Sequence, residues 1–156
     1  MIDLGKKDMR AWTRLARTHA LVTGALDARL KAAGLPPASW YPILVELEKA
    51  DPGGLRPFEI EEATGEAQYN ISRLLDRMTK AGLIVRAPCE NDRRGWRIAL
   101  AEPGRTTRSR MREIYGACLA ERFVDPLSGK QIRALDEILG DLLTRAKKSS
   151  APSAAA

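Results

Sequence analysis

The sequence is poor in the residues that build metal centres and disulfide frameworks. It contains 2 cysteines and 1 histidine among 156 residues, and Cys89 lies far from Cys118 along the chain. A structural zinc site needs about four such ligands at short spacings, so none is expected. The same scarcity leaves no nucleophile–base–acid set, and no glycine loop suited to phosphates is present. We therefore expect no metal, no cofactor and no enzymatic activity.

Long apolar runs are also missing. No segment approaches the roughly 20 apolar residues that span a bilayer, and residues 1–7 lack the apolar stretch of a signal peptide. These absences predict a cytoplasmic protein with no membrane partner. Charge, in contrast, is plentiful: 26 Lys and Arg residues against 20 Asp and Glu give a net charge of +6. This balance favours a polyanionic partner but does not report on the fold.

Hydrophobic periodicity predicts a mainly helical chain. Apolar residues recur at steps of three and four over residues 8–33, which places one stripe along a long helix. Glycine and proline at 34–37 end that helix. A second helix is expected to begin at Ser39, which can cap its N-terminus. Three more are expected over residues 57–65, 67–81 and 104–125, and a last one begins at a capping box at Ser128. The small, polar tail at 148–156 is expected to be disordered.

The period changes to two between residues 83 and 100. Residues 83–87 favour a strand, and Trp96, Ile98 and Leu100 alternate with smaller or charged residues. The polar, turn-rich segment 88–95 lies between them and contains Arg93 and Arg94. We expect a hairpin with a basic tip, which must pack on the preceding helices because a two-stranded hairpin alone is unstable.

Helix, glycine turn, helix and basic hairpin together predict a winged helix-turn-helix. An α-helix fits the major groove, where each base pair presents a distinct donor and acceptor pattern. The side chains expected to face DNA are Gln68, Tyr69, Asn70, Ser72, Arg73 and Arg77 on the second helix. Gln and Asn can bond adenine, Arg can bond guanine, and hydroxyls suit phosphates. Arg93 and Arg94 suit the narrow minor groove, whose negative potential attracts arginine.

Three segments resemble the MarR family of bacterial transcription regulators. Residues 64–78 (TGEAQYNISRLLDRM) and 80–86 (KAGLIVR) are similar to its recognition helix and first wing strand, and 91–95 (NDRRG), with Gly104 beyond, is similar to its wing signature. The resemblance implies a homodimer with interlocking first and last helices. It also implies a palindromic DNA operator, usually repressing a nearby gene, and release by a small aromatic or phenolic ligand.

The fold class expected is mainly α, a winged helix-turn-helix with a two-stranded β wing and N- and C-terminal dimerisation helices. The corresponding segments are a dimerisation helix at 1–35, a DNA-binding lobe at 36–102, C-terminal dimerisation helices at 103–147 and the tail. A hinge is expected after Gly104, where the next helix leaves the wing. Asp92 is either a simple turn residue or, as the family pattern suggests, an anchor of the wing that pairs with a recognition-helix arginine.

Two residues depart from the family pattern and motivate a second hypothesis. Glu66 stands where the turn usually has an apolar residue, and Ala67 where a capping Ser or Thr is common. Losing that cap costs about 1 kcal/mol. The alternative function is therefore a dimeric protein-interaction module that has lost DNA binding.

The remaining candidates are side chains with two readings each. A ligand pocket would be lined by Trp12, His19, Trp40, Tyr41, Met111 and Tyr115, although aromatics at helical spacing more often belong to a core. Arg105, Arg108, Arg110 and Arg112 are typical of a solvated helix face, with phosphate contact as the minority reading. Cys118 is expected to be a buried, inert thiol. Cys89 is expected to be exposed near the wing, and its redox role stays open.

Overall fold

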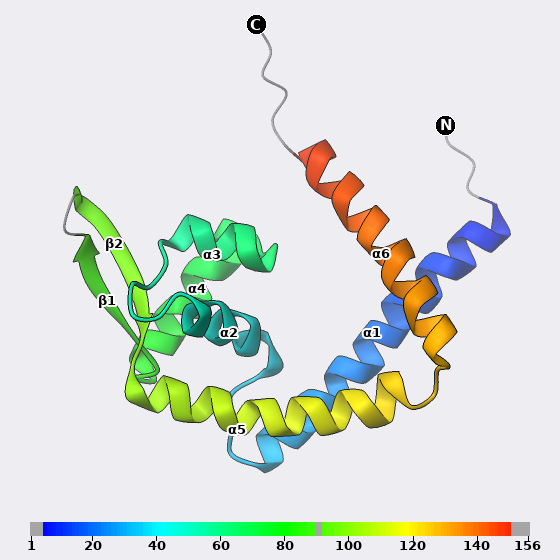
Figure 1. Ribbon diagram of the computed structural model, residues 1–156, viewed down its shortest axis with the longest axis horizontal. Coiled ribbons are helices and arrows are strands. Elements are labelled where there is room, and N and C mark those ends of the chain that lie inside the picture. The colour runs from blue at the N-terminus through cyan, green and yellow to red at the C-terminus, as the bar shows by residue number, and fades with distance from the viewer. Residues whose placement is uncertain (1–4, 90–91, 151–156) are drawn as a thin grey trace, which may run out of the picture. The chain divides into compact units, whose positions relative to one another are not determined.

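The computed structural model describes residues 5–89 and 92–150, excluding the side chains of residues 92–94 and 148–150. Its elements, in order, are α1 (Lys6–Ala32), η1 (Ala38–Trp40), α2 (Tyr41–Lys49), α3 (Pro57–Thr64), α4 (Gln68–Lys80), β1 (Ile84–Cys89), β2 (Asp92–Leu100), α5 (Glu102–Leu119), η2 (Ala120–Val124) and α6 (Gly129–Ser150) (Figure 1). The fold is mainly helical with a two-stranded antiparallel sheet, as predicted. The chain forms two compact units, residues 1–117 and 118–156. Within the described ranges, no helix combines the length and apolarity that crossing a membrane requires.

α1 is anchored in the first unit only by its C-terminal half. Leu26 and Leu30 are buried, whereas every residue from 5 to 21 is exposed. Gly34, at a φ of +68°, ends the helix, and the Leu35 amide donates to the Leu30 carbonyl at 2.9 Å. This is the hydrogen bond of a Schellman cap, in which glycine adopts the left-handed conformation without a steric penalty. The glycine–proline stop predicted at 34–37 is confirmed.

The expected cap at Ser39 is wrong. α2 begins at Tyr41 after the short 3₁₀ turn η1, and no side chain caps α2. The carboxylate of Asp27 on α1 instead accepts a 2.7 Å hydrogen bond from the Ala38 amide, at the start of η1. A carboxylate eleven residues away in the sequence thus accepts a backbone N–H at this helix start, where a cap from the local serine was expected.

α3 and α4 form the helix-turn-helix. Pro57 opens α3, and Glu59 reaches back to accept the Arg56 amide at 2.6 Å. The turn contains Gly65 at a φ of +73°, and Gly82, at +72°, follows α4. On α4 the predicted inner residues Ile71, Leu75 and Met78 are buried, and Leu74 is half-buried. On α3, in contrast, only Ile60 is fully buried, while Phe58 and Ala63 are exposed.

The hairpin packs on these helices through one face of β2. β1 and β2 pair in register from Ile84 opposite Leu100 to Pro88 opposite Trp96. Ile84, Ile98 and Leu100 are buried, and the backbone of Leu55 exchanges hydrogen bonds of 2.9 and 2.7 Å with Ile98. The segment before α3 therefore extends the pairing that stabilises the wing, which a free hairpin would lack.

The expected exposure of Cys89 is wrong, because this thiol is 8% exposed. The pairing register shifts between Pro88 and Cys89. Such an irregularity re-aims side chains relative to the simple alternation of a strand. Cys118 is fully buried, as predicted.

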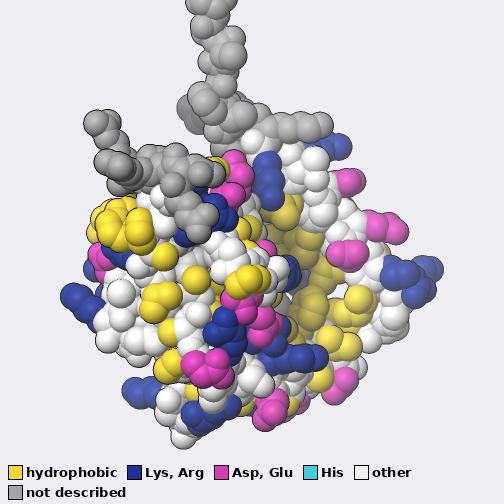
Figure 2. All heavy atoms as spheres, turned by 60° about the vertical axis from the view of Figure 1, so that its left-hand side comes forward, with side chains coloured by type: hydrophobic (Ala, Val, Ile, Leu, Met, Phe, Trp, Pro, Cys, Tyr) yellow, Lys and Arg dark blue, Asp and Glu magenta, His cyan; other side chains and the backbone are white. Residues whose placement is uncertain are grey.

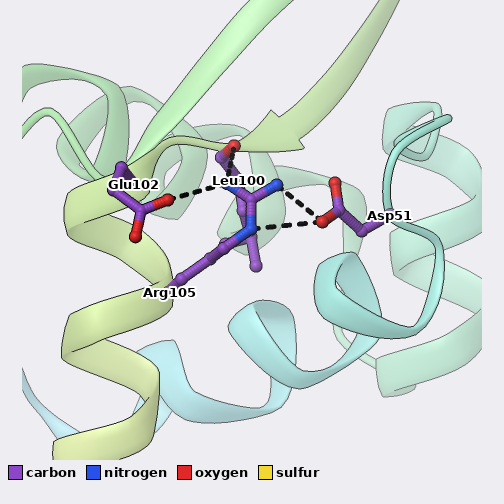
Figure 3. Close-up of polar contacts among 4 residues, drawn as sticks. All are labelled: Asp51, Leu100, Glu102 and Arg105. Carbon is purple, nitrogen blue, oxygen red and sulfur yellow. Dashed lines mark hydrogen bonds and ion pairs between the residues drawn. The ribbon is translucent and has the colours of Figure 1, made fainter.

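The start of α5 is held at close range against the α2–α3 turn and the end of the hairpin. α5 begins at Glu102 rather than at Gly104, and a Cβ atom added to Gly104 would lie 2.1 Å from the Leu83 carbonyl oxygen. Arg105 donates from Nη2 and Nε to Asp51 at 2.6 and 3.1 Å, and it lies beside Leu100 and Glu102 (Figure 3). These contacts hold together the α2–α3 turn, the end of β2 and the start of α5.

Two further arginines of the α5 run contact the protein itself. Arg108 pairs with Glu48 at 2.6 Å, and Arg110 donates to the Ala33 carbonyl at 3.1 Å. Arg97 on β2 adds two 2.7 Å hydrogen bonds to the carbonyls of Gly53 and Gly54. The reading of this run as a solvated face is therefore wrong for Arg105 and Arg108, which are half-buried, whereas Arg110 is exposed as that reading expects. Such crosslinks also oppose the hinge expected just after Gly104.

The second unit consists mainly of α6 and the turn before it. The capping box is confirmed, since the Ser128 amide donates to Gln131 Oε1 at 2.8 Å and the Gln131 amide to Ser128 Oγ at 3.3 Å. α6 continues to Ser150, so residues 148–150 are helical rather than part of the expected tail. Residues 151–156 lie outside the described part of the chain.

Candidate nucleic-acid interface

The outer face of α4 carries the six side chains predicted to meet DNA. Each of them is exposed: Gln68, Tyr69, Asn70, Ser72, Arg73 and Arg77. Ile71, between Asn70 and Ser72, is fully buried on the opposite face. One helix thus separates an apolar anchoring stripe from a polar stripe of hydrogen-bonding groups. α4 begins at Gln68 although Ala67 supplies no side-chain cap, and its buried stripe holds it in place instead.

Two side-chain pairs lie along this outer face. Asn70 donates from Nδ2 to Glu66 Oε2 at 3.3 Å, and Arg73 donates from Nη1 to Tyr69 Oη at 2.7 Å. The Arg73 guanidinium also lies 5.3 Å from the centre of the Tyr69 ring, which is cation–π geometry. The sequence shows both pairs as residues four apart, a spacing that places side chains together on a helix. The departure at Glu66 is therefore a solvent-facing contact rather than a defect in the turn.

An ion pair connects the wing to α4. Nη2 of Arg86 on β1 lies 2.5 Å from Oδ1 of Asp76 on α4. The family pattern suggested an ion pair with the charges the other way round, in which Asp92 on the wing pairs with an arginine on the helix. The side chains of Asp92, Arg93 and Arg94 lie outside the described residues, so their predicted roles stay predictions. The contact between Asp76 and Arg86 carried no local sequence signal, because ten residues and a turn separate its partners.

Two hollows flank α4. One of about 200 Å³ lies between α3, α4 and the wing, and its lining includes Glu61, Gln68, Ser72, Arg86 and Trp96. The other, of about 390 Å³, is lined by Ser39, Glu66, Asn70, Arg73, Leu74 and Arg77. On the face shown in Figure 2, Lys and Arg side chains are interspersed with Asp and Glu rather than gathered into one patch.

The residues predicted to line a ligand pocket do not line either hollow. Trp12 is 64% exposed and His19 is exposed on α1, whereas Met111 is fully buried and Trp40 is half-buried. The structure brings Tyr41 and Tyr115 together, with ring centres 4.1 Å apart and ring planes at 22°. The Tyr115 hydroxyl donates to the Ala38 carbonyl at 3.0 Å. In this conformation these two tyrosines pack α5 onto α2.

Burial raises the pKa of Tyr115 to about 12, and the nearby Asp27 and Tyr41 add to the shift. The folded state holds the Tyr115 proton more tightly than the unfolded chain. The titration of Tyr115 therefore leaves the free energy of unfolding unchanged below pH 10 and lowers it between pH 10 and about 12. We expect Tyr115→Phe to lose about 1 kcal/mol at neutral pH with the hydrogen bond to Ala38. The variant should also lose stability less steeply above pH 10. Urea denaturation from pH 8 to 12 measures both effects, and parallel pH curves for the two proteins would contradict the assignment.

The winged-helix segment matches a known family. Residues 33–95 match the model of the MarR family, and a structure that covers nearly the whole chain belongs to a protein of that family. The chain is similar to MarR-family proteins in this segment and in its overall fold. The α4 and wing geometry described above corresponds to the winged helix of that family.

Three solved structures show the extent of this likeness. AbsC, a MarR family transcriptional regulator from Streptomyces coelicolor, is 27% identical over 95% of this chain and 99% of its own, with a TM-score of 0.84. Sco3205 from the same organism, solved in complex with DNA, is 22% identical over 99% and 95%, with a TM-score of 0.84. CouR from Rhodococcus jostii RHA1, bound to p-coumaroyl-CoA, is 26% identical over 82% and 87%, with a TM-score of 0.69.

Proposed function

We propose that this chain is a transcriptional regulator of the MarR family that binds a palindromic DNA operator as a homodimer and represses the gene beside it. The observation that carries the proposal is the exposed polar face of α4, backed by a buried stripe and flanked by the hairpin. The exposed amide and guanidinium groups on that face are the donors and acceptors that read base edges in the major groove. We propose Arg93 and Arg94 on β2 as minor-groove contacts.

The case for a homodimer rests on apolar side chains that each unit leaves uncovered. Trp12 is 64% exposed and Leu21 75% on α1, and Met9 and Leu15 are exposed on the same helix. On α6, Ile138, Leu142 and Leu143 are each more than half exposed. Uncovered apolar groups along a helix mark protein interfaces. We therefore assign residues 1–35 and 103–147 to dimerisation and 36–102 to DNA binding. The two DNA-binding lobes of such a dimer would contact operator half-sites about 10 bp apart.

We propose that a small aromatic or phenolic ligand releases the protein from DNA. CouR was solved with p-coumaroyl-CoA, whose acyl group is aromatic. A ligand lowers operator affinity only when it binds the DNA-incompetent conformation more tightly than the competent one. Trp12, His19, Trp40, Tyr41, Met111 and Tyr115 remain the candidate pocket residues, which requires Tyr41 and Tyr115 to separate. This role is regulatory and involves no catalysis.

Titration of the DNA upstream of the gene tests the proposal. We expect two chains per duplex and an affinity that falls steeply as salt rises, because phosphate contacts release counterions. Arg73→Ala should weaken operator binding by about 1–3 kcal/mol, or roughly fivefold to 150-fold, by removing a base contact. Fluorescence anisotropy with labelled duplex measures both. Absence of binding even at low salt would favour the protein-interaction module instead.

A further inference from the structure

The pairs Glu66–Asn70 and Tyr69–Arg73 restrict two side chains that would otherwise move freely. Asn70 and Arg73 are exposed on the outer face of α4, so packing does not hold them. Their polar ends are held instead by neighbours one helical turn toward the N-terminus, through contacts of 3.3 and 2.7 Å. An exposed arginine loses considerable rotamer entropy when it binds a partner, and a contact that already holds it reduces that loss.

The contact with Glu66 determines how the Asn70 amide is oriented. Because a carboxylate accepts only, the group that faces Glu66 must be the amide nitrogen. One N–H and the carbonyl oxygen of Asn70 remain available. A free N–H beside a carbonyl is what adenine requires, since its N7 accepts and its N6 donates. An amide turned the other way would place its carbonyl oxygen against the carboxylate, which is electrostatically unfavourable.

The contact with Tyr69 leaves Arg73 suited to guanine. The guanidinium uses Nη1 to donate to the phenol, and its central carbon lies over the ring at 5.3 Å from the ring centre. Four of its five N–H groups remain, including the parallel pair on Nε and Nη2. That edge matches the two acceptors O6 and N7 of guanine. The hydrogen bond and the cation–π contact together restrict the position of the guanidinium, and with it the direction of a bidentate contact.

We infer that Glu66 and Tyr69 are positioning residues that set the base preference of α4, Glu66 for adenine through Asn70 and Tyr69 for guanine through Arg73. The inference rests on the proposed function. Glu66 is a poor candidate for affinity, because a carboxylate is repelled by phosphates. The carboxylate lowers affinity for every DNA sequence alike. It can still raise specificity by orienting the Asn70 amide, because specificity is the difference between the affinities for two sequences.

The test measures affinities for the operator and for duplexes that change one base pair at a time. In Tyr69→Phe the ring stays and the acceptor hydroxyl is lost, so the preference for guanine at one position should fall about threefold to tenfold. In Glu66→Gln the preference for adenine at a different position should fall by a similar factor. The salt dependence should stay unchanged in Tyr69→Phe. Glu62→Gln removes a similarly exposed charge from α3 and should leave both preferences intact.

A double-mutant cycle separates positioning from direct contact. Tyr69→Phe should have no effect on operator affinity in an Arg73→Ala background, and Glu66→Gln should not alter base preference in an Asn70→Ala background. Equal losses with and without Arg73 would show that the phenol contacts DNA itself and would overturn the inference. Unchanged base preferences in both single variants, with wild-type operator binding intact, would overturn it too. Failure of the wild type to bind any duplex would instead contradict the proposed function.

Discussion

Replacing Gly104 with alanine is expected to lower the free energy of unfolding by about 2–3 kcal/mol, in the upper part of the range for overpacking. The new Cβ would lie 2.1 Å from the Leu83 carbonyl oxygen, and it would contact backbone rather than a flexible side chain. That same oxygen accepts the Ala101 amide at 3.0 Å. Relieving the overlap therefore disturbs the backbone junction where β2 leads into α5.

Thermal denaturation measures this effect, and the expected decrease in Tm is about 5–10 °C for a chain of this size. Gly116→Ala is the matched control, because it lies in the same helix and its added Cβ meets nothing within 4 Å. That control should gain about 0.5–1 kcal/mol, since alanine is the better helix former. Similar changes in the two variants would show that helix propensity, not the close approach to Leu83, governs residue 104.

Ile71→Ala is expected to lower the free energy of unfolding by about 2–5 kcal/mol. Ile71 is fully buried on the inner face of α4, where truncation removes buried methyl groups and leaves a cavity. Ser72→Ala, one residue farther, should change stability by less than about 0.5 kcal/mol because its side chain is exposed. The two faces of one helix thus differ sharply in what they contribute to folding.

Urea denaturation combined with operator titration tests this separation. Ile71→Ala should lower the denaturation midpoint with an unchanged slope, whereas Ser72→Ala should retain the midpoint and weaken operator binding. Binding is compared at a temperature where both variants are folded. If Ser72→Ala destabilised the protein as much as Ile71→Ala, the assignment of inner and outer faces on α4 would be wrong.

The sequence alone predicted the features that depend on neighbouring residues. Gly34, Gly65 and Gly82 each adopt a positive φ at a helix end, where glycine is the residue with the smallest penalty. The inner stripe of α4 followed from a period that any amphipathic helix obeys. The capping box at Ser128 involves partners three residues apart. Such signals are readable because both partners lie within one or two turns of the chain.

Only the tertiary structure decided which charged and polar groups are paired across the fold. Arg105 contacts Asp51, Arg108 contacts Glu48, and the Ala38 amide donates to Asp27 rather than to Ser39. The register shift beside Cys89 likewise depends on how two strands meet. A charge pattern specifies that a partner exists but not where the chain places it. Local conformation follows from sterics and hydrogen bonds within a few residues, whereas these pairings form when packing brings distant segments together.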